Sequence, residues 1–250
     1  MNKFNQIDVQ PELIATPNPR IGLVALSTDF TIEQDYRRIC HNLPVDIFMN
    51  RIPFENPLNQ ENYLKMIDHL PNIVENILPK QNLDTVAYGC TSGTIAIGEK
   101  IISKQIHKSK PHAYITTPIT AALRAFEKLR IKRLAVLAPY PKEVNQTVFD
   151  YLVKKNIEVL NFSSFNLHYD SEIAMVDPTN IIQTIKNINH SKADAVFVSC
   201  TALRAVEILE EIENIINKTV ISSNQAIIWD SIRSVGINNE IKNFGKLMRK

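Results

Sequence analysis

The chain has 250 residues, 44% of them hydrophobic and 22% charged, which is ordinary for a soluble globular protein and enough for two domains. It carries 28 Lys and Arg against 26 Asp and Glu, and these charges are scattered, which argues against the basic stripe of a nucleic-acid binder. We find no apolar run of membrane-spanning length and no signal peptide, so we expect a cytoplasmic protein without a membrane partner.

The local basic tail at 246–250 is expected to be a solvated terminus. Three cysteines at positions 40, 90 and 200 give neither a disulfide framework nor the close spacing of a zinc site. The six histidines show no pairing on one helical face, so no metal is expected.

The first half of the chain alternates buried apolar runs with helical patterns. Strands are expected at 21–26, 45–49, the run ending at Cys90, and 112–116, with helices at 31–38, 62–78 and 93–106. Thr31 and Gln34 have the spacing of a capping box, and Pro71 should kink or divide its helix. The Pro-rich segment 51–58 follows the carboxyl end of a strand, where it fits either a lid or a plain connector.

The same order restarts after residue 118. Strands are expected at 133–138, 158–162, the run ending at Cys200, and 219–222, with helices at 119–129, 143–154, 179–188, 202–216 and 226–235. A polar loop is expected at 163–177. Strands that alternate with helices at this spacing indicate parallel βαβ units.

We therefore predict an α/β fold of two Rossmann-like subdomains, each a four-stranded parallel sheet flanked by helices, related by a pseudo-twofold axis. The N-terminal α/β subdomain is expected to comprise residues 1–117 plus 225–250, and the C-terminal one residues 118–224. The active site is expected in the cleft between them. Oligomeric state is left open, with a homo-oligomer among the outcomes.

A duplicated motif carries the functional prediction. Residues 83–91 (LDTVAYGCT) align without a gap on residues 193–201 (ADAVFVSCT), which superposes Cys90 on Cys200 and Thr91 on Thr201. Each copy closes a buried-strand pattern and opens a helical one. A fold duplicated in this way brings one thiol from each half to a shared cleft.

A thiol at the start of a helix lies where backbone N–H groups and the helix dipole favour negative charge, so we expect both cysteines to ionise readily. Thr91, Ser92 and Thr201 add hydroxyl donors for a carboxylate or enolate oxygen. The alternative is that both cysteines are small buried hydrophobes and that the hydroxyls only cap helices. With no GxGxxG loop and 6 glycines in all, a dinucleotide cofactor is not expected.

The segments 89–94 (GCTSGT) and 199–204 (SCTALR) together resemble the aspartate/glutamate racemase superfamily, and within it the branch of maleate cis-trans isomerases, arylmalonate decarboxylases and ectoine-utilisation proteins. The resemblance covers nearly the whole chain. It implies two cysteines that flank a small carboxylate substrate without any cofactor. The decarboxylases are expected to keep only the cysteine of the second half, so the presence of both argues against that activity.

Carried over by motif, the resemblance makes Cys90 the nucleophile or base and Cys200 the acid, while Thr91, Ser92 and Thr201 hold carboxylate oxygens. Tyr140, which follows the first strand of the second half, matches a tyrosine that hydrogen-bonds a substrate carboxylate in this branch; otherwise it is a tyrosine in a Pro-rich turn.

One position departs from the branch. Maleate isomerases present an Asn in the loop after the first strand, whereas this chain has Asp29 there. An ionised Asp29 would repel a dicarboxylate and leave room for a substrate with an amino group, or it would cap the following helix without touching a ligand.

The function predicted from these features is a cofactor-independent isomerase of a small carboxylate, similar to maleate cis-trans isomerase. The alternatives are a racemase or epimerase of an amino acid or its derivative, of the aspartate/glutamate or ectoine-catabolism type, and a non-catalytic small-molecule binding protein.

Overall fold

The computed structural model describes residues 4–15, 18–189 and 191–250. The first half contains β1 (Arg20–Leu26), α1 (Ile32–Cys40), β2 (Asp46–Ile52), α2 (Gln60–Glu75), β3 (Thr85–Gly89), α3 (Thr91–Ile97), α4 (Glu99–His107) and β4 (Tyr114–Thr116). The second half contains α5 (Pro118–Lys128), β5 (Arg133–Ala138), α6 (Lys142–Lys154), β6 (Glu158–Ser164), α7 (Asp170–Ala174), α8 (Pro178–Ile188), β7 (Ala195–Val198), η1 (Val206–Ile208), α9 (Leu209–Ile216), β8 (Thr219–Ser222), α10 (Ser223–Ser234) and η2 (Lys246–Arg249).

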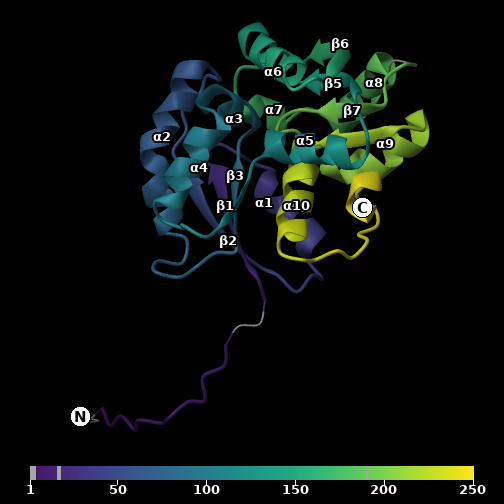
Figure 1. The fold of residues 1–250 in the computed structure, drawn as a ribbon. Coiled ribbons are helices and arrows are strands. Elements are labelled where there is room, and N and C mark those ends of the chain that lie inside the picture. The colour runs from purple at the N-terminus through teal and green to yellow at the C-terminus, as the bar shows by residue number, and fades with distance from the viewer. Residues whose placement is uncertain (1–3, 16–17, 190) are drawn as a thin grey trace.

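The strands form two four-stranded parallel sheets with equivalent orders, β2-β1-β3-β4 and β6-β5-β7-β8. Figure 1 shows the second sheet across the top of the molecule with α6 and α8, and the first sheet at the lower left beside α2 and α4. The predicted α/β fold of two similar sheets flanked by helices is confirmed.

Burial explains the strand sequences. The central strands β3 and β7 are buried along their whole length, and β1 and β5 are buried except at their first residue. This is why they appear as continuous apolar runs rather than alternating ones. The edge strands β2 and β6 are mostly half-buried, which accounts for the mixture of polar and apolar residues in both.

The aspartates of the duplicated motif have the same structural role in both halves. Asp84 accepts a hydrogen bond from the backbone N–H of Arg20, at the start of β1, with an N–O distance of 2.7 Å. Asp194 accepts from the backbone N–H groups of Lys132 and Arg133, before and at the start of β5, and also pairs with the Arg133 guanidinium at 2.7 Å. Each carboxylate therefore ties the third strand of its sheet to the first.

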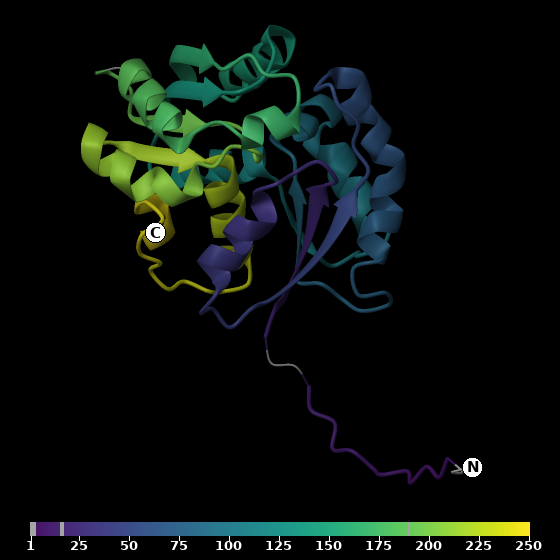
Figure 2. The same ribbon diagram turned by 180° about the vertical axis from the view of Figure 1, so that it is seen from behind.

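The last helix of the chain returns to the first sheet. α10 packs on α5, β3, β4 and α1, and Figure 2 shows it in yellow beside the purple α1. Hydrogen bonds between the Ser231 and Tyr36 hydroxyls (2.8 Å) and between the Ser234 and Thr85 hydroxyls (2.7 Å) fix this contact. These contacts agree with grouping residues 225–250 with the N-terminal subdomain, and the domain boundaries stay a prediction.

Three predicted helices differ in detail. α2 continues through Pro71 rather than dividing. The helix predicted at 93–106 is interrupted at Gly98, whose φ of 94° is accessible to glycine without strain. The helix predicted at 202–216 is wrong over its first turns, because the chain after Cys200 stays irregular up to η1. Ala202, Leu203 and Ala205 are all buried there, which one face of an amphipathic helix would not provide.

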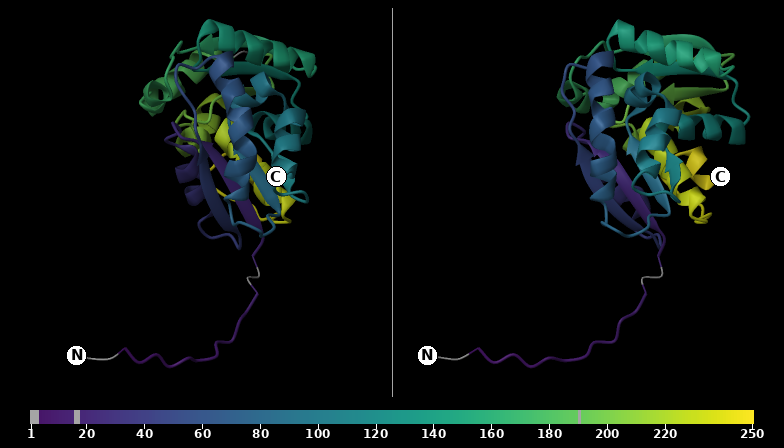
Figure 3. Two further views of the ribbon diagram at one scale, coloured as in Figure 1. Left: turned by 90° about the vertical axis from the view of Figure 1, so that its left-hand side faces the viewer. Right: turned by 60° about the vertical axis from the view of Figure 1, so that its left-hand side comes forward.

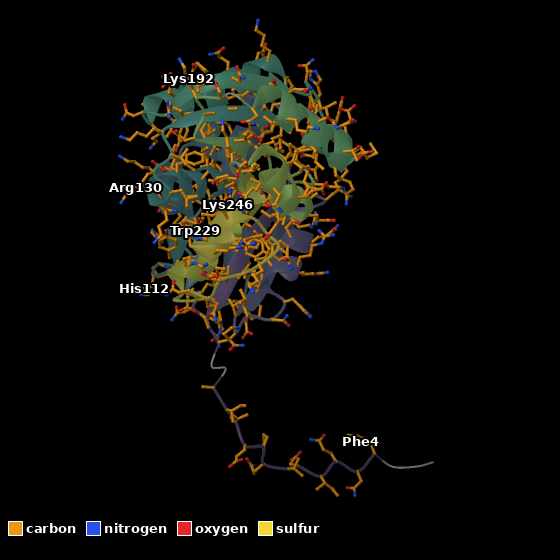
Figure 4. The ribbon with its side chains drawn as sticks, turned by 90° about the vertical axis from the view of Figure 1, so that its right-hand side faces the viewer. Phe4, His112, Arg130, Lys192, Trp229 and Lys246 are labelled. Atoms are coloured by element: carbon orange, nitrogen blue, oxygen red, sulfur yellow. The ribbon has the colours of Figure 1, made fainter. Side chains whose placement is uncertain are left out.

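Two segments predicted to lack structure contain helical turns. The short helix α7 lies inside the predicted loop 163–177. The tail predicted as a solvated terminus forms η2, in which Leu247 and Met248 are fully buried. The Trp229 indole donates to the Lys250 carbonyl at 3.0 Å, and Figure 4 shows Trp229 and Lys246 on the same face of the molecule.

Residues 4–15 form neither helix nor strand, are exposed, and extend away from the two sheets in both views of Figure 3. None of the helices among the described residues has the length and apolar character needed to cross a membrane.

We predict that Asp194→Asn lowers the free energy of unfolding by about 1–2 kcal/mol, because the amide loses the ion pair and one or both backbone hydrogen bonds. The Arg133 side chain lowers the pKa of Asp194. The difference between wild type and variant should therefore be full above about pH 5 and shrink as the pH falls below about 4, where the wild-type carboxylate becomes protonated. Urea unfolding at several pH values measures this difference in free energy. Asp68→Asn, at an exposed position, is the control, and an equal loss of stability in that variant would contradict the role given to Asp194.

Candidate active site

Cys90 lies between β3 and α3, as the N-cap residue of α3. Its sulfur accepts a hydrogen bond from the backbone N–H of Gly93 at 3.2 Å, and the Thr94 hydroxyl donates to its carbonyl at 2.5 Å. An added Cβ at Gly93 would approach the Cys90 sulfur to 2.7 Å, so glycine is needed for this close approach. The cysteine at the start of a helix is the arrangement predicted for the first motif.

Cys200 lies at the equivalent end of β7, but no helix starts there. Its sulfur accepts from the backbone N–H of Ala202 at 3.3 Å. The prediction of a helix dipole behind this second thiol is therefore wrong. Its sulfur is stabilised by one local N–H group and by a hydrogen bond with Tyr140.

The carboxyl ends of the two sheets meet through direct contacts. The Thr201 hydroxyl donates to the carbonyl of Gly89, the last residue of β3, at 3.4 Å. The Thr201 carbonyl accepts from the Thr31 hydroxyl and from the Asn224 amide, the latter at 2.8 Å. The residue after each cysteine thus lies at the junction of the two halves.

The predicted hydroxyl residues are all buried at this junction. Thr91 donates to the Ser223 hydroxyl at 2.9 Å, and Ser92 donates to the Tyr63 hydroxyl at 2.9 Å. Tyr63, on α2, was missed by sequence reasoning, because a tyrosine at a buried helix position is not distinguished from a core residue. In the structure its ring also stacks on Phe54, with ring centroids 5.4 Å apart.

Tyr140 is buried directly after β5, as predicted. Its carbonyl accepts from the Asn145 amide at 2.5 Å and from the Ser164 hydroxyl at 2.7 Å, which fixes the backbone of the turn. Both cysteines raise the pKa of Tyr63 and of Tyr140, after the larger effect of burial. The two thiols therefore share the same two tyrosine neighbours.

Asp29 caps α1. One carboxyl oxygen, Oδ1, accepts from the backbone N–H groups of Thr31 at 2.7 Å and Ile32 at 2.9 Å. The capping box predicted for Thr31 and Gln34 is wrong, because Asp29 supplies the cap and Gln34 donates to the Phe30 carbonyl instead. The carboxyl of Asp29 is 4% exposed, and its second oxygen, Oδ2, has no hydrogen-bond partner among the described residues.

Asp170, the first residue of α7, is a second buried carboxyl at this place. Its Oδ2 accepts from the Thr28 hydroxyl at 2.5 Å, and its backbone N–H donates to the Asn56 side chain at 3.3 Å. Sequence reasoning missed Asp170 because it lies in a segment whose polar composition predicted a loop. It approaches the loop that carries Asp29 through the hydrogen bond from Thr28, 142 positions earlier in the chain.

The segment 51–58 connects the two halves. The Leu58 N–H donates to the His168 carbonyl at 3.0 Å, and the Asn56 side chain accepts from the N–H of Asp170. A cavity of about 580 Å³ opens beside it; Thr28, Asp29, Arg51 and Asn56 are among the residues that line it, and the two cysteines are not. These contacts favour a covering role for segment 51–58 over a plain connector, and its movement as a lid stays a prediction.

Comparison with known proteins places the chain in a family. The family model for arylmalonate decarboxylase matches residues 57–248, which is most of the chain. The chain belongs to the arylmalonate decarboxylase family. It is 21% identical over 243 residues to a maleate isomerase of Alcaligenes faecalis and 22% identical over 244 residues to one of Geobacillus stearothermophilus, covering 92% of this chain and 96% of each relative.

The fold is also shared with a solved structure of this family. A mutant Nocardia farcinica maleate cis-trans isomerase with a covalently bound succinylcysteine intermediate superposes with a TM-score of 0.84 at 17% identity, covering 92% of this chain and 98% of that one. The resemblance to the maleate isomerase and arylmalonate decarboxylase branch is thereby confirmed.

The electrostatics of the family site in this chain differ from the sequence prediction. Burial raises the pKa of the Cys90 thiol to about 12, outweighing the Gly93 N–H, which lowers it. Burial raises the pKa of Cys200 as well. Asp170 and Asp29 raise both further. The expectation that both cysteines ionise readily is wrong for these buried thiols, because desolvation exceeds the effect of the local N–H groups.

The carboxyl groups are shifted in the same direction. Burial raises the pKa of Asp170 to about 6 and also raises that of Asp29, for which the two capping N–H groups, Thr201 and Arg51 act in the opposite sense. Both carboxyls disfavour ionisation of the two thiols, and Asp29 disfavours ionisation of Asp170. No three His, Cys, Asp or Glu side chains in the described part of the chain are arranged to hold a metal ion.

We predict that iodoacetamide labels Cys90 of the folded protein at pH 8 more slowly than the unfolded chain by on the order of 10³, because the thiolate is scarce at a pKa near 12. The rate should rise about tenfold per pH unit up to pH 10. Cys90 should react before Cys200, since the Gly93 N–H and Ser92 stabilise its thiolate. Peptide mass spectrometry measures the rates; a plateau near pH 8, or earlier labelling of Cys200, would contradict this.

Proposed function

We propose that this protein is a cofactor-independent cis-trans isomerase of a small unsaturated carboxylate, acting through Cys90 and Cys200. The observation that carries the proposal is that the two thiols end equivalent strands of the two sheets and share Tyr63, Tyr140, Asp29 and Asp170 as neighbours. Two thiols that influence the same groups are placed to act on one small molecule.

In the proposed reaction, the Cys90 proton leaves to solvent as the substrate binds. The thiolate then adds to the alkene carbon that lies β to a carboxylate, and Cys200 gives its proton to the neighbouring carbon. The former double bond is now single and rotates. Cys200 takes the proton back, the carbon–sulfur bond breaks, and the alkene re-forms as the trans isomer. All bonds and protons balance without a cofactor.

The surrounding residues have defined roles in this proposal. The Gly93 N–H stabilises the Cys90 sulfur, while Tyr140 does so for Cys200. When the substrate binds, the hydroxyls of Thr91, Ser92 and Thr201 turn from Ser223, Tyr63 and the Gly89 carbonyl to the carboxylate, whose oxygens gain negative charge when sulfur adds. The succinylcysteine intermediate of the Nocardia farcinica maleate isomerase supports an addition of this kind in a protein of the same fold.

We predict that Cys90→Ser and Cys200→Ser each lower turnover of the isomerised cis acid by on the order of 10³ or more, since each removes a group that bonds to the reacting atoms or transfers a proton to them. Proton NMR of a panel of cis-unsaturated acids, comprising maleate, (Z)-but-2-enoate and (Z)-4-aminobut-2-enoate, measures the reaction.

Cys40→Ser is the matched control, because Cys40 is also buried but lies at the far end of α1. It should keep turnover within about threefold at equal folded fraction. Cys200→Ser should accumulate an adduct on Cys90 with the mass of one substrate molecule. Full activity in either active-site variant would reject the mechanism, and α-proton exchange of an amino acid instead of isomerisation would favour a racemase.

A further inference from the structure

The carboxyl of Asp29 is only half satisfied. Its Oδ1 receives two backbone N–H groups, whereas Oδ2 is buried and has no partner in hydrogen-bond geometry in the described part of the chain; the nearby Thr201 side chain lowers the pKa of Asp29. Asp29 also lines a cavity with Thr28, Arg51 and Asn56. A buried carboxylate oxygen without a donor is unfavourable, so this oxygen is a candidate to receive a donor from a ligand.

Asp170 adds a second negative charge at the same place. The Thr28 hydroxyl joins its Oδ2 to the loop that carries Asp29, and Asp29 disfavours ionisation of Asp170. Both carboxyls also disfavour the thiolates of Cys90 and Cys200. The proposed site therefore gathers four groups that carry negative charge when ionised.

One cation, Arg51, lines the same cavity as Asp29, but its guanidinium is engaged by other groups. None of the ion pairs found among the described residues includes Asp29 or Asp170. Arg51 is the cation that lowers the pKa of Asp29, and it does so as the weakest of the contributing groups. Its guanidinium binds the carbonyls of Leu26, Ser27 and Asp29 and the Glu33 carboxylate, and its side chain is 40% exposed.

We infer that the substrate is a monocarboxylate carrying an ammonium group, which Asp29 and Asp170 bind, rather than a dicarboxylate. The inference rests on the proposed isomerase function and specifies its substrate class. An ammonium group offers three donors and a positive charge, which meets the unpartnered Oδ2 of Asp29 and compensates both carboxylates. A second carboxylate at the same place would meet two like charges.

The proposed reaction is the same when the second carboxylate of maleate is replaced by an ammonium group. In (Z)-4-aminobut-2-enoate the alkene is still conjugated to one carboxylate, so the Cys90 thiolate adds at the carbon β to that carboxylate and is expelled after rotation. The bound ammonium also lies near the thiols and lowers the pKa of Cys90 by the attraction of opposite charges. A cationic substrate therefore promotes formation of the nucleophile that attacks it, and a dianion opposes it.

The test compares three cis acids whose far group is anionic, neutral or cationic: maleate, (Z)-but-2-enoate and (Z)-4-aminobut-2-enoate. At pH 7.5 the wild-type kcat/KM should be highest for the amino acid and lowest for maleate, with the extremes differing by about a hundredfold or more. In the Asp29→Asn/Asp170→Asn double variant the amides keep the shape of the carboxyls without their charge. The kcat/KM for the amino acid divided by the kcat/KM for maleate should therefore fall by at least about tenfold.

Asp230→Asn is the matched control, because Asp230 is equally buried but pairs with Arg124 on α5. This variant should leave the order of kcat/KM among the three acids unchanged. Binding to the unmodified protein gives a measurement that does not depend on whether a variant folds: by calorimetry, saturated 4-aminobutanoate should bind more tightly than succinate.

Each outcome bears on one of the two hypotheses. Fast Cys90-dependent turnover of maleate with the amino acid inert would overturn the inference and leave the isomerase function intact, as would tighter binding of succinate. An unchanged ratio in a folded double variant would also overturn it. Turnover of none of the three acids, together with preferred binding of 4-aminobutanoate, would reject the isomerase function and support the charge preference.

Discussion

The meeting of the two sheets at the carbonyl of Thr201 is the contact on which the site depends. This one oxygen accepts from Thr31, which precedes α1, and from Asn224 on α10, while the Thr201 hydroxyl reaches back to the end of β3. Asn224 also binds the buried carboxyl of Asp35. Because these hydrogen bonds link the carboxyl ends of both sheets, the residues that follow β3 and β7 are held opposite each other, and Cys90 and Cys200 with them.

Burial then decides the chemistry of the groups that meet there. A thiol at a helix N-terminus is more acidic than free cysteine when water also reaches it, but Cys90 and Cys200 are only 3% and 4% exposed. Desolvation and two neighbouring carboxyls exceed the local N–H groups, so charge in this site is unfavourable until a ligand supplies the opposite charge. In the proposed mechanism, the charge of the substrate and the formation of the Cys90 thiolate are therefore coupled through the same electrostatic field.

The sequence was informative where the physics is local and repeated. The strand patterns predicted both sheets, because buried parallel strands must be apolar. The two Cys-Thr motifs predicted that the halves are alike, because Asp84 and Asp194 in these motifs make the same hydrogen bond to the first strand of each sheet. Tyr63 and Asp170 could not be predicted, since their roles depend on contacts between distant segments. The irregular segment after Cys200 was likewise hidden, because consecutive burial of Ala202 and Leu203 is a tertiary effect that overrides helix propensity.

The hydrogen bonds between segment 51–58 and the loop before α7 have a consequence for the survival of the thiols. Asn56 from the first half holds the backbone N–H of Asp170, whose carboxyl raises the pKa of both cysteines. Both sulfurs are therefore protonated and almost out of contact with water. Peroxides attack thiolates rather than thiols, and they need access to the sulfur. The joined loops thus also favour resistance of both cysteines to oxidation.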